Sequence, residues 1–392
     1  MMEMKYTKLK CINQYKNKSI NPAKTPDTVF EMYSVPIYET GHPEYLRGNE
    51  IASNKVIVEK NDILLCKINP RINRVWVVAD ESDKQNIASS EWIVIRNSEY
   101  NAEFLAWYFR SFRFQKLMTS EVTGIGGSLT RAQPKCVAEY PVPVLDRKKQ
   151  NEIVEILNKC KFIIDSRKRE LVELDNLIKA RFVEMFGDPQ INPFGWDVVN
   201  ISEVVGGKVS NGFFAKRDDY VDDGNVSVLG VANIVNRMYS KVDELPKTNA
   251  EDKDIEKFEV RYGDMLFCRS SLVADGIGKA SIIPENVQEN VLFECHVIRL
   301  PLNLRKCVPE FMQTLSTMDF FRNQVIAQSK TATMTTIGQD GILKTNIILP
   351  PLDKQIEFYV FVNQVDKSKV AIQAALDKSQ LLFDSLMQKY FG

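Results

Sequence analysis

The stretch Asp146-Arg-Lys-Lys-Gln150 opens a long helical pattern that ends at Glu184-Met-Phe-Gly187, and the chain later repeats this plan. The second copy begins at Asp353-Lys-Gln355 and ends at Lys389-Tyr-Phe-Gly392. The two opening glutamines lie 205 positions apart, and so do the two closing phenylalanines, so the offset holds without a gap. An internal repeat indicates the overall architecture of a chain, so it is stronger evidence for the fold class than any local sequence feature.

Both copies carry apolar residues at alternating steps of three and four, which keeps one face of a helix apolar over many turns. In the first copy these residues are Ile153, Leu157, Cys160, Ile164, Leu171, Leu174, Ile178 and Met185. In the second copy they are Phe358, Val362, Val365, Ile372, Leu376, Phe383, Leu386 and Tyr390. Polar residues interrupt each stripe where the other copy stays apolar: Arg167, Arg181, Lys369 and Ser379.

Neither copy contains an internal Pro or Gly, and each covers about 35 to 40 residues, or roughly 55 to 60 Å of helix. We therefore predict two long antiparallel helices packed on each other. Ordinary core helices are the alternative, but their mean length is about a third of this. We expect Gly187 to end the first helix. We also expect the prolines of 141–143 and 350–351 to break any strand and start each helix cleanly.

The segments before the two helices are also related, because Asn61-Asp-Ile-Leu-Leu-Cys66-Lys67 resembles Gly263-Asp-Met-Leu-Phe-Cys268-Arg269. Short β-branched or aromatic runs predict strands over 63–66, 74–78, 92–95, 226–229, 265–268, 280–283 and 296–300. Helices are expected over 103–117 and 310–326, and His296 is expected to be a core residue of its apolar run.

The predicted fold class is α+β, with two mixed, mostly β domains separated by two long antiparallel helices in a pseudo-two-fold repeat. The expected domains are 1–145, a central helix 146–190, a second globular domain 191–351 and a terminal helix 352–392.

Composition fits an ordinary soluble globular protein, since 44% of the 392 residues are apolar and 26% are charged. We expect no membrane span, because there is no run of about 18 uninterrupted apolar residues. The seven cysteines form no C-x-x-C pair, which favours reduced thiols in a cytoplasmic protein and disfavours a zinc site. A net charge of zero neither favours nor excludes binding to nucleic acid.

The patterns of common enzymes are missing. No G-x-G-x-x-G, no P-loop and no Asn-Pro-Pro-aromatic stretch occurs in the sequence. The two histidines, His42 and His296, are far apart in sequence, which disfavours a His-based triad or metal site. We therefore expect no catalytic residues, no metal site and no cofactor site in this chain.

Polar side chains alternate with apolar ones after the first related strand, at Lys67, Asn69, Arg71 and Asn73, and Arg74 continues the basic run. A period of two places alternate residues on one face of an extended segment. These side chains are the types that contact base edges and phosphates. Arg269 and Ser271 occupy the corresponding positions of the second half. The alternative is a solvated strand edge protected by charges.

Two loops with small or hydroxyl side chains, 123–131 and 329–336, offer further candidates for contact with a nucleic-acid backbone. Ordinary surface loops are the alternative for each. The candidate residues of these loops and of the segment 211–217 are Gly126, Ser128, Arg131, Lys216, Arg217, Lys330 and Thr333.

The two helix endings, 181–188 and 385–391, resemble the two conserved regions of type I restriction–modification specificity subunits. The segments 143–150, 350–355, 62–71 and 263–264 also look like parts of that family, so the resemblance covers essentially the whole chain. It implies a DNA-binding subunit that binds two methylation subunits and, through them, two restriction subunits. S-adenosylmethionine, ATP and Mg2+ are then expected in those partners.

Under this interpretation two domains read two different DNA half-sites, and the helices fix the gap between them. A scaffold or adaptor with a helical dimerisation stem is the second hypothesis, and a stand-alone nuclease is the third. Basic residues gathered on one surface would favour DNA reading over the scaffold. A carboxylate cluster able to hold magnesium would favour the nuclease.

Overall fold

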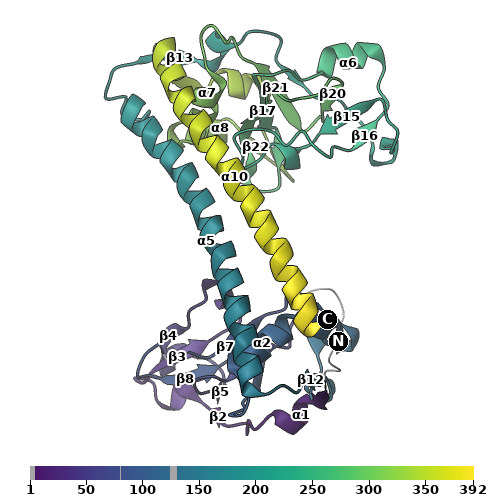
Figure 1. Ribbon diagram of the computed structural model, residues 1–392. Helices are drawn as coiled ribbons and strands as arrows, with labels where there is room; N and C mark the ends of the chain where they lie inside the picture. Colours follow the sequence, from purple (N-terminus) through teal and green to yellow (C-terminus); the bar gives the residue numbers. More distant parts are fainter. Residues whose placement is uncertain (1–4, 80, 124–129) are drawn as a thin grey trace. The chain divides into compact units, whose positions relative to one another are not determined.

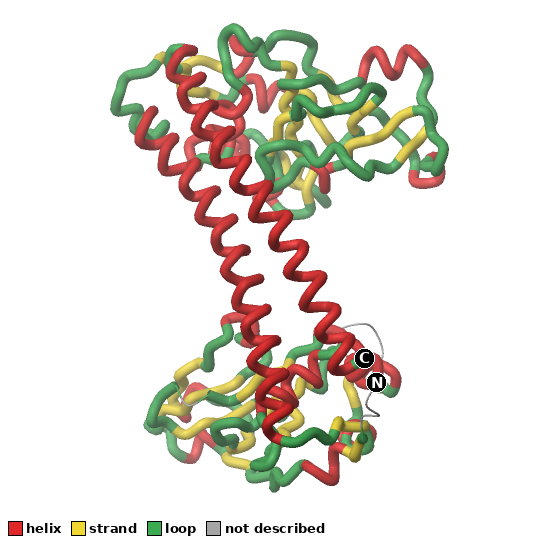
Figure 2. Tube along the Cα trace, in the orientation of Figure 1, coloured by secondary structure: helices red, strands yellow, loops and turns green. Residues whose placement is uncertain are grey.

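The structure is a computed structural model that describes residues 5–79, 81–123 and 130–392. The chain divides into two units. Unit 1 comprises Met1–Lys168 and Ala374–Gly392, and unit 2 comprises Arg169–Gln373. Figure 2 shows helix and strand mixed in both units, so the fold is mixed α/β. Within the part of the chain that the structure describes, no helix combines the length and apolarity needed to cross a membrane.

Two helices of 40 residues each, α5 (Arg147–Phe186) and α10 (Leu352–Phe391), dominate the chain, and α5 packs on α10 (Figure 1). Every residue of the two predicted apolar stripes is buried or half-buried. The lengths and the packing of the helices confirm the prediction from their three-and-four periodicity.

Polar residues that interrupt the stripes form bonds between the helices. In unit 1, the Arg167 guanidinium donates to the Ala375 carbonyl at 2.5 Å and also to the Ser379 hydroxyl. In unit 2, the Lys369 ammonium lies 2.6 Å from the Asp175 carboxylate, and Arg181 pairs with Glu357 at 3.7 Å. As the residue number rises along α5 its partner's number falls along α10, so the two helices are antiparallel.

A buried glutamine near the start of each long helix bonds the helix to other segments of the same unit. In unit 1, Gln150 Oε1 accepts from the Asn101 backbone N–H at 2.7 Å, and Nε2 donates to the carbonyl five residues earlier at 2.8 Å. In unit 2, Gln355 Oε1 accepts from the Val308 N–H at 2.9 Å, and Nε2 donates to the carbonyl five residues earlier at 2.8 Å. The repeated glutamine of the sequence therefore satisfies the same two kinds of backbone group in both units, part-buried in unit 1 and buried in unit 2.

Gly187 ends α5, as predicted. Its φ of +76° lies in the left-handed region that favours glycine at this position of a helix. Its N–H donates to the Val183 carbonyl at 2.8 Å. A Cβ here would also lie 2.4 Å from the Pro193 ring, so only glycine fits.

Unit 1 holds two main sheets. The mixed sheet has the order β2-β5-β8-β3-β4 (Ser19–Ile20, Lys55–Ile57, Gln85–Ala88, Val29–Tyr33, Glu44–Arg47). The antiparallel sheet has the order β7-β6-β9 (Val75–Val77, Ile63–Cys66, Trp92–Ile95). Two antiparallel pairs are also described in unit 1, namely β1-β12 (Tyr6–Lys8, Pro141–Pro143) and β10-β11 (Val122–Thr123, Arg131–Ala132). The central strand β6 is buried throughout, because Ile63 and Leu65 pack with the residues of α2 and α3 while Leu64 and Cys66 pack with Trp76 and Trp92 of the neighbouring strands.

The short helices in the described part of unit 1 are α1 (Leu9–Ile12), α2 (Ala102–Arg110), α3 (Phe112–Ser120) and α4 (Pro134–Val137). The end of α10 packs against α2, where the ring of Phe391 lies 5.6 Å from that of Phe104 and 5.8 Å from that of Tyr108. The Trp107 indole donates to Asn158 of α5 at 2.8 Å. Both long helices therefore help to form the core of unit 1.

Unit 2 is built on the antiparallel sheet β14-β21-β17-β19 (Ser210–Asn211, Val297–Pro301, Asp264–Cys268, Ala280–Ile282). A mixed sheet has the order β16-β15-β20 (Lys247–Thr248, Val226–Leu229, Val291–Phe293). A small antiparallel sheet has the order β18-β23-β22 (Ser270–Ser271, Thr335–Thr336, Lys330–Thr331), and β13 pairs with β24 (Asp197–Asn200, Asn346–Leu349).

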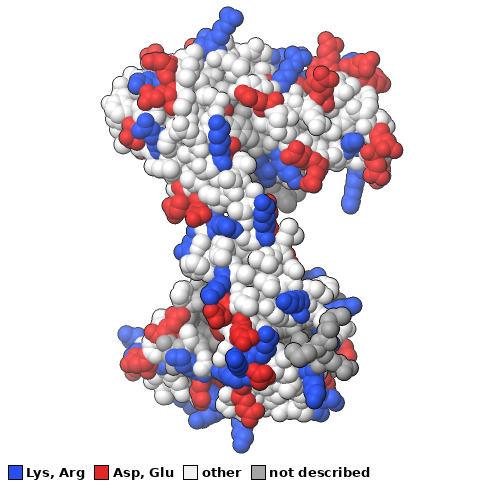
Figure 3. All heavy atoms as spheres, in the orientation of Figure 1, with Lys and Arg blue, Asp and Glu red and all other residues white. Residues whose placement is uncertain are grey.

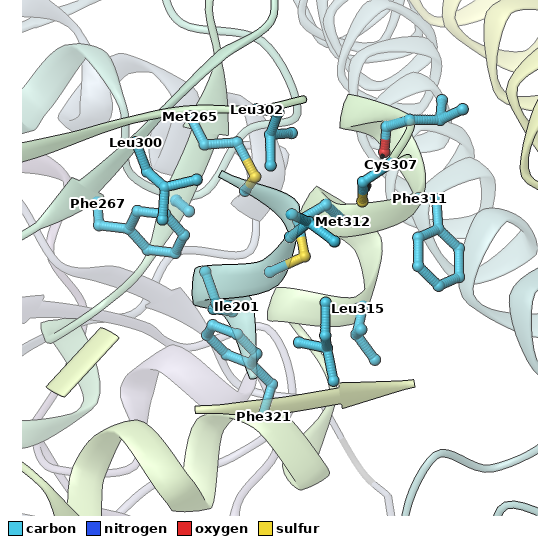
Figure 4. Packing of buried hydrophobic residues seen from close by; sticks show 14 of the residues in the cluster. Ile201, Met265, Phe267, Leu300, Leu302, Cys307, Phe311, Met312, Leu315 and Phe321 are labelled. Carbon is cyan, nitrogen blue, oxygen red and sulfur yellow. Dashed lines mark hydrogen bonds between the residues drawn. The ribbon is translucent and has the colours of Figure 1, made fainter. Parts of the chain in front are cut away.

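The helices of unit 2 are α6 (Asp252–Phe258), α7 (Pro309–Ser316), α8 (Asp319–Ala327) and α9 (Gln339–Leu343). Figure 4 shows the core that they enclose, where side chains of α7 and α8 meet those of β17 and β21. Phe311 of α7 stacks on Phe182 of α5 with ring centroids 5.4 Å apart. This contact fixes the end of α5 within unit 2.

Four expectations about local structure are wrong. The helix expected over 103–117 is two helices, because Ser111 is extended and its hydroxyl accepts from the Phe114 N–H at 3.3 Å as the cap of α3. The helix expected over 310–326 is likewise divided, between α7 and α8. Pro141–Pro143 forms β12 instead of breaking a strand, which a two-stranded edge pair tolerates. His296 is exposed instead of lying in the core.

Candidate nucleic-acid interface

In unit 1 the candidate residues gather where the central strand β6 ends. The Lys67 backbone N–H donates to the Glu91 carbonyl at 3.0 Å, and its carbonyl accepts from the Ala132 N–H at 2.9 Å. The Lys67 ammonium donates to the Ser90 carbonyl at 2.6 Å. The backbone and side chain of this residue are therefore fixed at the edge of the sheet.

The chain beyond Lys67 is a tight turn, so the expectation of an extended segment over 67–73 is wrong. Pro70–Ile72 forms one turn of 3-10 helix, flanked by Asn69 with φ +45° and Asn73 with φ +52°. Asparagine adopts this left-handed conformation more readily than other non-glycine residues. The Asn73 amide donates to the Arg110 carbonyl at 3.1 Å, so the argument from period two does not give these side chains a common face.

This turn contains buried amide oxygens. The side-chain Oδ1 atoms of Asn69 and Asn73 are buried and have no hydrogen-bond partner among the described residues. The Arg71 side chain is exposed, whereas that of Arg74 is half-buried. Arg131 on β11 is exposed and pairs with Glu91 at 3.3 Å. Gly126 and Ser128 lie outside the described residues.

In unit 2 Arg269 follows the central strand β17 as Lys67 follows β6. Its backbone N–H donates to the His296 carbonyl at 2.8 Å, and its carbonyl accepts from the Ile337 N–H at 3.0 Å. Its guanidinium donates to the Cys295 carbonyl at 3.3 Å. The backbone and side-chain bonds of Arg269 therefore match those of Lys67.

The sheet β18-β23-β22 brings three more candidates beside Arg269. Ser271 on β18 pairs with Thr335, and Lys330 on β22 pairs with Thr336. Thr333 lies in the turn between β22 and β23. The side chains of Lys330 and Thr333 are exposed and that of Ser271 is half-buried, so this sheet presents hydroxyl and ammonium groups together.

Lys216 and Arg217 come from a different segment of unit 2. Phe213 forms a bridge to Glu294, in the turn whose Cys295 and His296 carbonyls bind Arg269. Both basic side chains are exposed, and the Lys216 N–H donates to the Asp219 carboxylate at 2.7 Å. This segment is linked to the Arg269 region through that turn and through β14, whose Asn211 pairs with Ile298 of β21.

A buried thiol stands at the end of each central strand. Burial raises the pKa of Cys66 and of Cys268, so both remain protonated at neutral pH. Each thiol donates to the carbonyl two residues further along, Ile68 or Ser270, at 3.3 Å. The thiols therefore help to hold the chain where it leaves the sheet.

On the face shown in Figure 3, Lys and Arg are interspersed with Asp and Glu. That face shows no single basic surface of the kind that would favour DNA reading. Within residues 5–79, 81–123 and 130–392, no three His, Cys, Asp or Glu side chains form a group that could hold a metal ion.

No family model matches the chain, and no curated protein does. Solved structures do match it over its whole length. One comes from work on how a type I restriction–modification system assembles and changes conformation. Its sequence is 17% identical to this chain, and the two superpose with a TM-score of 0.55 over 100% of this chain and 98% of that one. Another is the S subunit of a type I system from M. genitalium; it is 11% identical, with a TM-score of 0.56 over 100% of this chain and 96% of that one.

The chain has the fold of a type I restriction–modification S subunit. The resemblance inferred from the sequence is thus confirmed at the level of the fold. Sequence reasoning missed Leu272 and Val273, which are exposed beside Arg269. The sequence did contain a signal for this pair. Two apolar residues follow the polar residues 269–271 directly, whereas polar and apolar residues would alternate in a half-buried strand.

Proposed function

We propose that the chain is the sequence-reading subunit of a type I restriction–modification complex and that it acts on double-stranded DNA in the cytoplasm. The observation that carries this proposal is the S-subunit fold over the full chain, together with a basic residue fixed at the same place in each unit. Because the side chains of Arg and Lys at the end of a rigid strand are already held in place, they can contact bases or phosphates with little further loss of conformational entropy.

We further infer that the two units are copies of one ancestral unit. Asp62 and Asp264 both accept a hydrogen bond from the backbone N–H three residues earlier, at 2.8 and 2.9 Å. Gln150 and Gln355 repeat the same pair of backbone bonds. The recognition domains are then 1–145 and 191–351, and the helices 146–190 and 352–392 serve as spacer and docking elements.

Diverged copies would read different sequences, so the target is bipartite and asymmetric. The chain itself catalyses nothing in this proposal. Two methylation subunits supply S-adenosylmethionine chemistry, and two restriction subunits supply ATP- and Mg2+-dependent cleavage. The complex then modifies an adenine in each half-site after flipping it from the duplex.

Selection from a pool of random duplexes tests the reading function. The full chain with its methylation subunits is expected to enrich two short half-sites separated by a constant gap. Omitting the chain should abolish the enrichment. A complex that enriches no sequence, although it is folded and assembled, would support the scaffold hypothesis instead.

A further inference from the structure

Leu272 and Val273 form an exposed apolar tip next to the basic candidates of unit 2. Their exposed fractions are 81% and 64%, and they directly follow Ser271 of β18. Aliphatic side chains are normally withdrawn from water when the fold allows it. These two adjacent side chains therefore form a small exposed apolar surface directly beside the basic candidates.

The tip belongs to a well-bonded loop. The Arg322 guanidinium donates to the Ile277 carbonyl at 2.5 Å and to the Asp275 carbonyl at 2.8 Å. The Asp275 carboxylate pairs with Lys279 at 2.8 Å. The Ser271 hydroxyl accepts from the Val273 N–H at 3.2 Å. These bonds hold the loop at its base while its two apolar side chains point to water, which is a preorganised arrangement.

Cationic and hydroxyl groups surround the tip. The half-buried Ser271 lies on β18 and the exposed Lys330 lies on β22 of the same small sheet. Arg269 immediately precedes β18. The one carboxylate of the loop, Asp275, is already paired with Lys279. An apolar centre with this polar, mostly basic rim complements a partner that has anionic edges and apolar interior surfaces.

Double-stranded DNA has this chemistry. Its phosphates form the anionic edges, and its grooves offer thymine methyl groups and the faces of unstacked bases. Unit 1 carries a related feature in the turn after its own central strand. Ile72 there is 46% exposed, beside the exposed Arg71.

Resting on the proposed function, we propose that Leu272 and Val273 are specificity-determining residues that touch the bases of the half-site read by unit 2. The surrounding basic and hydroxyl side chains bind the phosphates. Apolar contact with a thymine methyl and insertion between base pairs are the two forms that this contact takes in DNA complexes. Both use the same exposed aliphatic groups.

The test uses the full chain assembled with its methylation subunits and the duplex selected by the wild-type complex. The variant is Leu272→Ser with Val273→Ser, and the matched control is Leu304→Ser. Leu304 is also exposed in unit 2, but it contacts Gly263 at the opposite end of the β17–β21 ladder. Since all three residues are exposed, thermal unfolding should be unchanged in each variant.

The double variant should bind the selected duplex about tenfold more weakly while its binding to random duplex stays the same. The salt dependence should not change, because no phosphate contact is lost. Deoxyuridine in place of thymine, or 2-aminopurine fluorescence at each half-site position, should identify the contacted base in the wild type and lose that signal in the variant.

Equal binding by the double variant and the wild type would overturn the inference while leaving the proposed function intact. Equal weakening on selected and random duplex would also overturn it, as would loss of the methylation subunits without loss of base selectivity. If the wild-type complex selects no sequence at all, the proposed function itself fails.

Discussion

At the scale of single residues, Gln150 and Gln355 explain why a glutamine recurs at the start of both long helices. Each side chain satisfies a backbone N–H and a backbone carbonyl, which are buried around Gln355 and part-buried around Gln150. A buried donor or acceptor left without its partner costs about 1 to 3 kcal/mol. Comparing the two halves of this sequence reveals that the glutamine is repeated, but only the structure shows which backbone groups it satisfies.

Replacing Gln355 with Leu should therefore lower the free energy of unfolding by about 1 to 3 kcal/mol in urea titrations. Gln364→Leu is the control, because Gln364 is exposed on the same helix. It should change stability by less than about 0.5 kcal/mol. Equal effects of the two substitutions would contradict the role assigned to Gln355.

Glu310 predicts a pH dependence of stability. Its side chain is buried, Oε1 accepts from the Tyr239 hydroxyl at 3.0 Å, and Oε2 has no partner in the described part of the chain. Burial, reinforced by the nearby Glu285 and Asp366 carboxylates, raises the pKa of Glu310 above its ordinary value of 4.5. The folded state therefore holds this proton more tightly than the unfolded state does.

Its contribution to stability is consequently complete below pH 4.5 and is lost as the pH rises through the folded-state pKa. Glu310→Gln keeps an acceptor for Tyr239 and removes the charge, so it should be more stable than the wild type at pH 8. That advantage should shrink towards pH 4, as measured by urea unfolding at each pH. The exposed Glu289→Gln is the control. An advantage that does not depend on pH would refute the explanation.

Arg269 and Lys67 allow a reciprocal test of base reading. Arg269→Ala should cost about 1 to 3 kcal/mol and relax one position of one half-site if it contacts a base. If it contacts a phosphate, binding should weaken for all sequences and the salt slope should fall by about one.

Lys67→Ala should act in the same way on the other half-site. If a quadruple Ala variant of Lys67, Asn69, Arg71 and Arg269 binds unchanged, these faces do not read DNA.

At the scale of elements, the long helices were the most predictable part of the fold, because their apolar period persists over 40 residues. The same criterion failed at Ser111 and between α7 and α8, where apolar periodicity continues across a local break. The turn after Lys67 was read as extended because its polar residues alternate, whereas two asparagines in left-handed conformation form it. Helix capping and turn geometry determine the backbone conformation at these positions, and the period of the apolar residues carries no information about either.

The helices also carry a prediction about target spacing. Each long helix has one part in each unit. In the proposed function the two helices act as the spacer between the half-sites, so their length should set the gap. Four residues inserted after Glu173 in α5 and after Ala371 in α10 would add roughly 6 Å to each helix. Four residues only slightly exceed one turn, so the apolar stripes stay nearly in register. The bonds Lys369–Asp175 and Arg167–Ala375 lie on either side of the insertions and are kept.

The lengthened complex should prefer a gap one or two base pairs longer, since B-DNA rises about 3.4 Å per base pair. Both half-site sequences should stay the same when duplexes of varied spacing are compared in binding assays. Insertion in only one helix is the control and should disrupt the pairing. Changed half-sites with an unchanged gap, or equal binding at every spacing, would refute the spacer role.

At the scale of the whole molecule, the repeat predicted the S-subunit fold, whereas the sequence indicated candidate DNA-contacting residues without showing which of them lie together. The structure brings Arg269, Ser271, Lys330 and Thr333 together on one small sheet and its flanks, although 58 residues separate Ser271 from Lys330 in sequence. Leu272 and Val273 are visible in the sequence as an apolar pair, but only the structure shows that they are exposed. Such sites depend on tertiary contacts that a single sequence does not display.

The central claim is that this chain chooses the DNA sequence on which its partners act. Mapping methylated adenines across the genome of cells with and without the chain tests it most directly. We predict methylation at one bipartite, asymmetric motif that is present with the chain and absent without it. Identical methylated motifs in both kinds of cell, with the methylation subunits present in each, would contradict the claim.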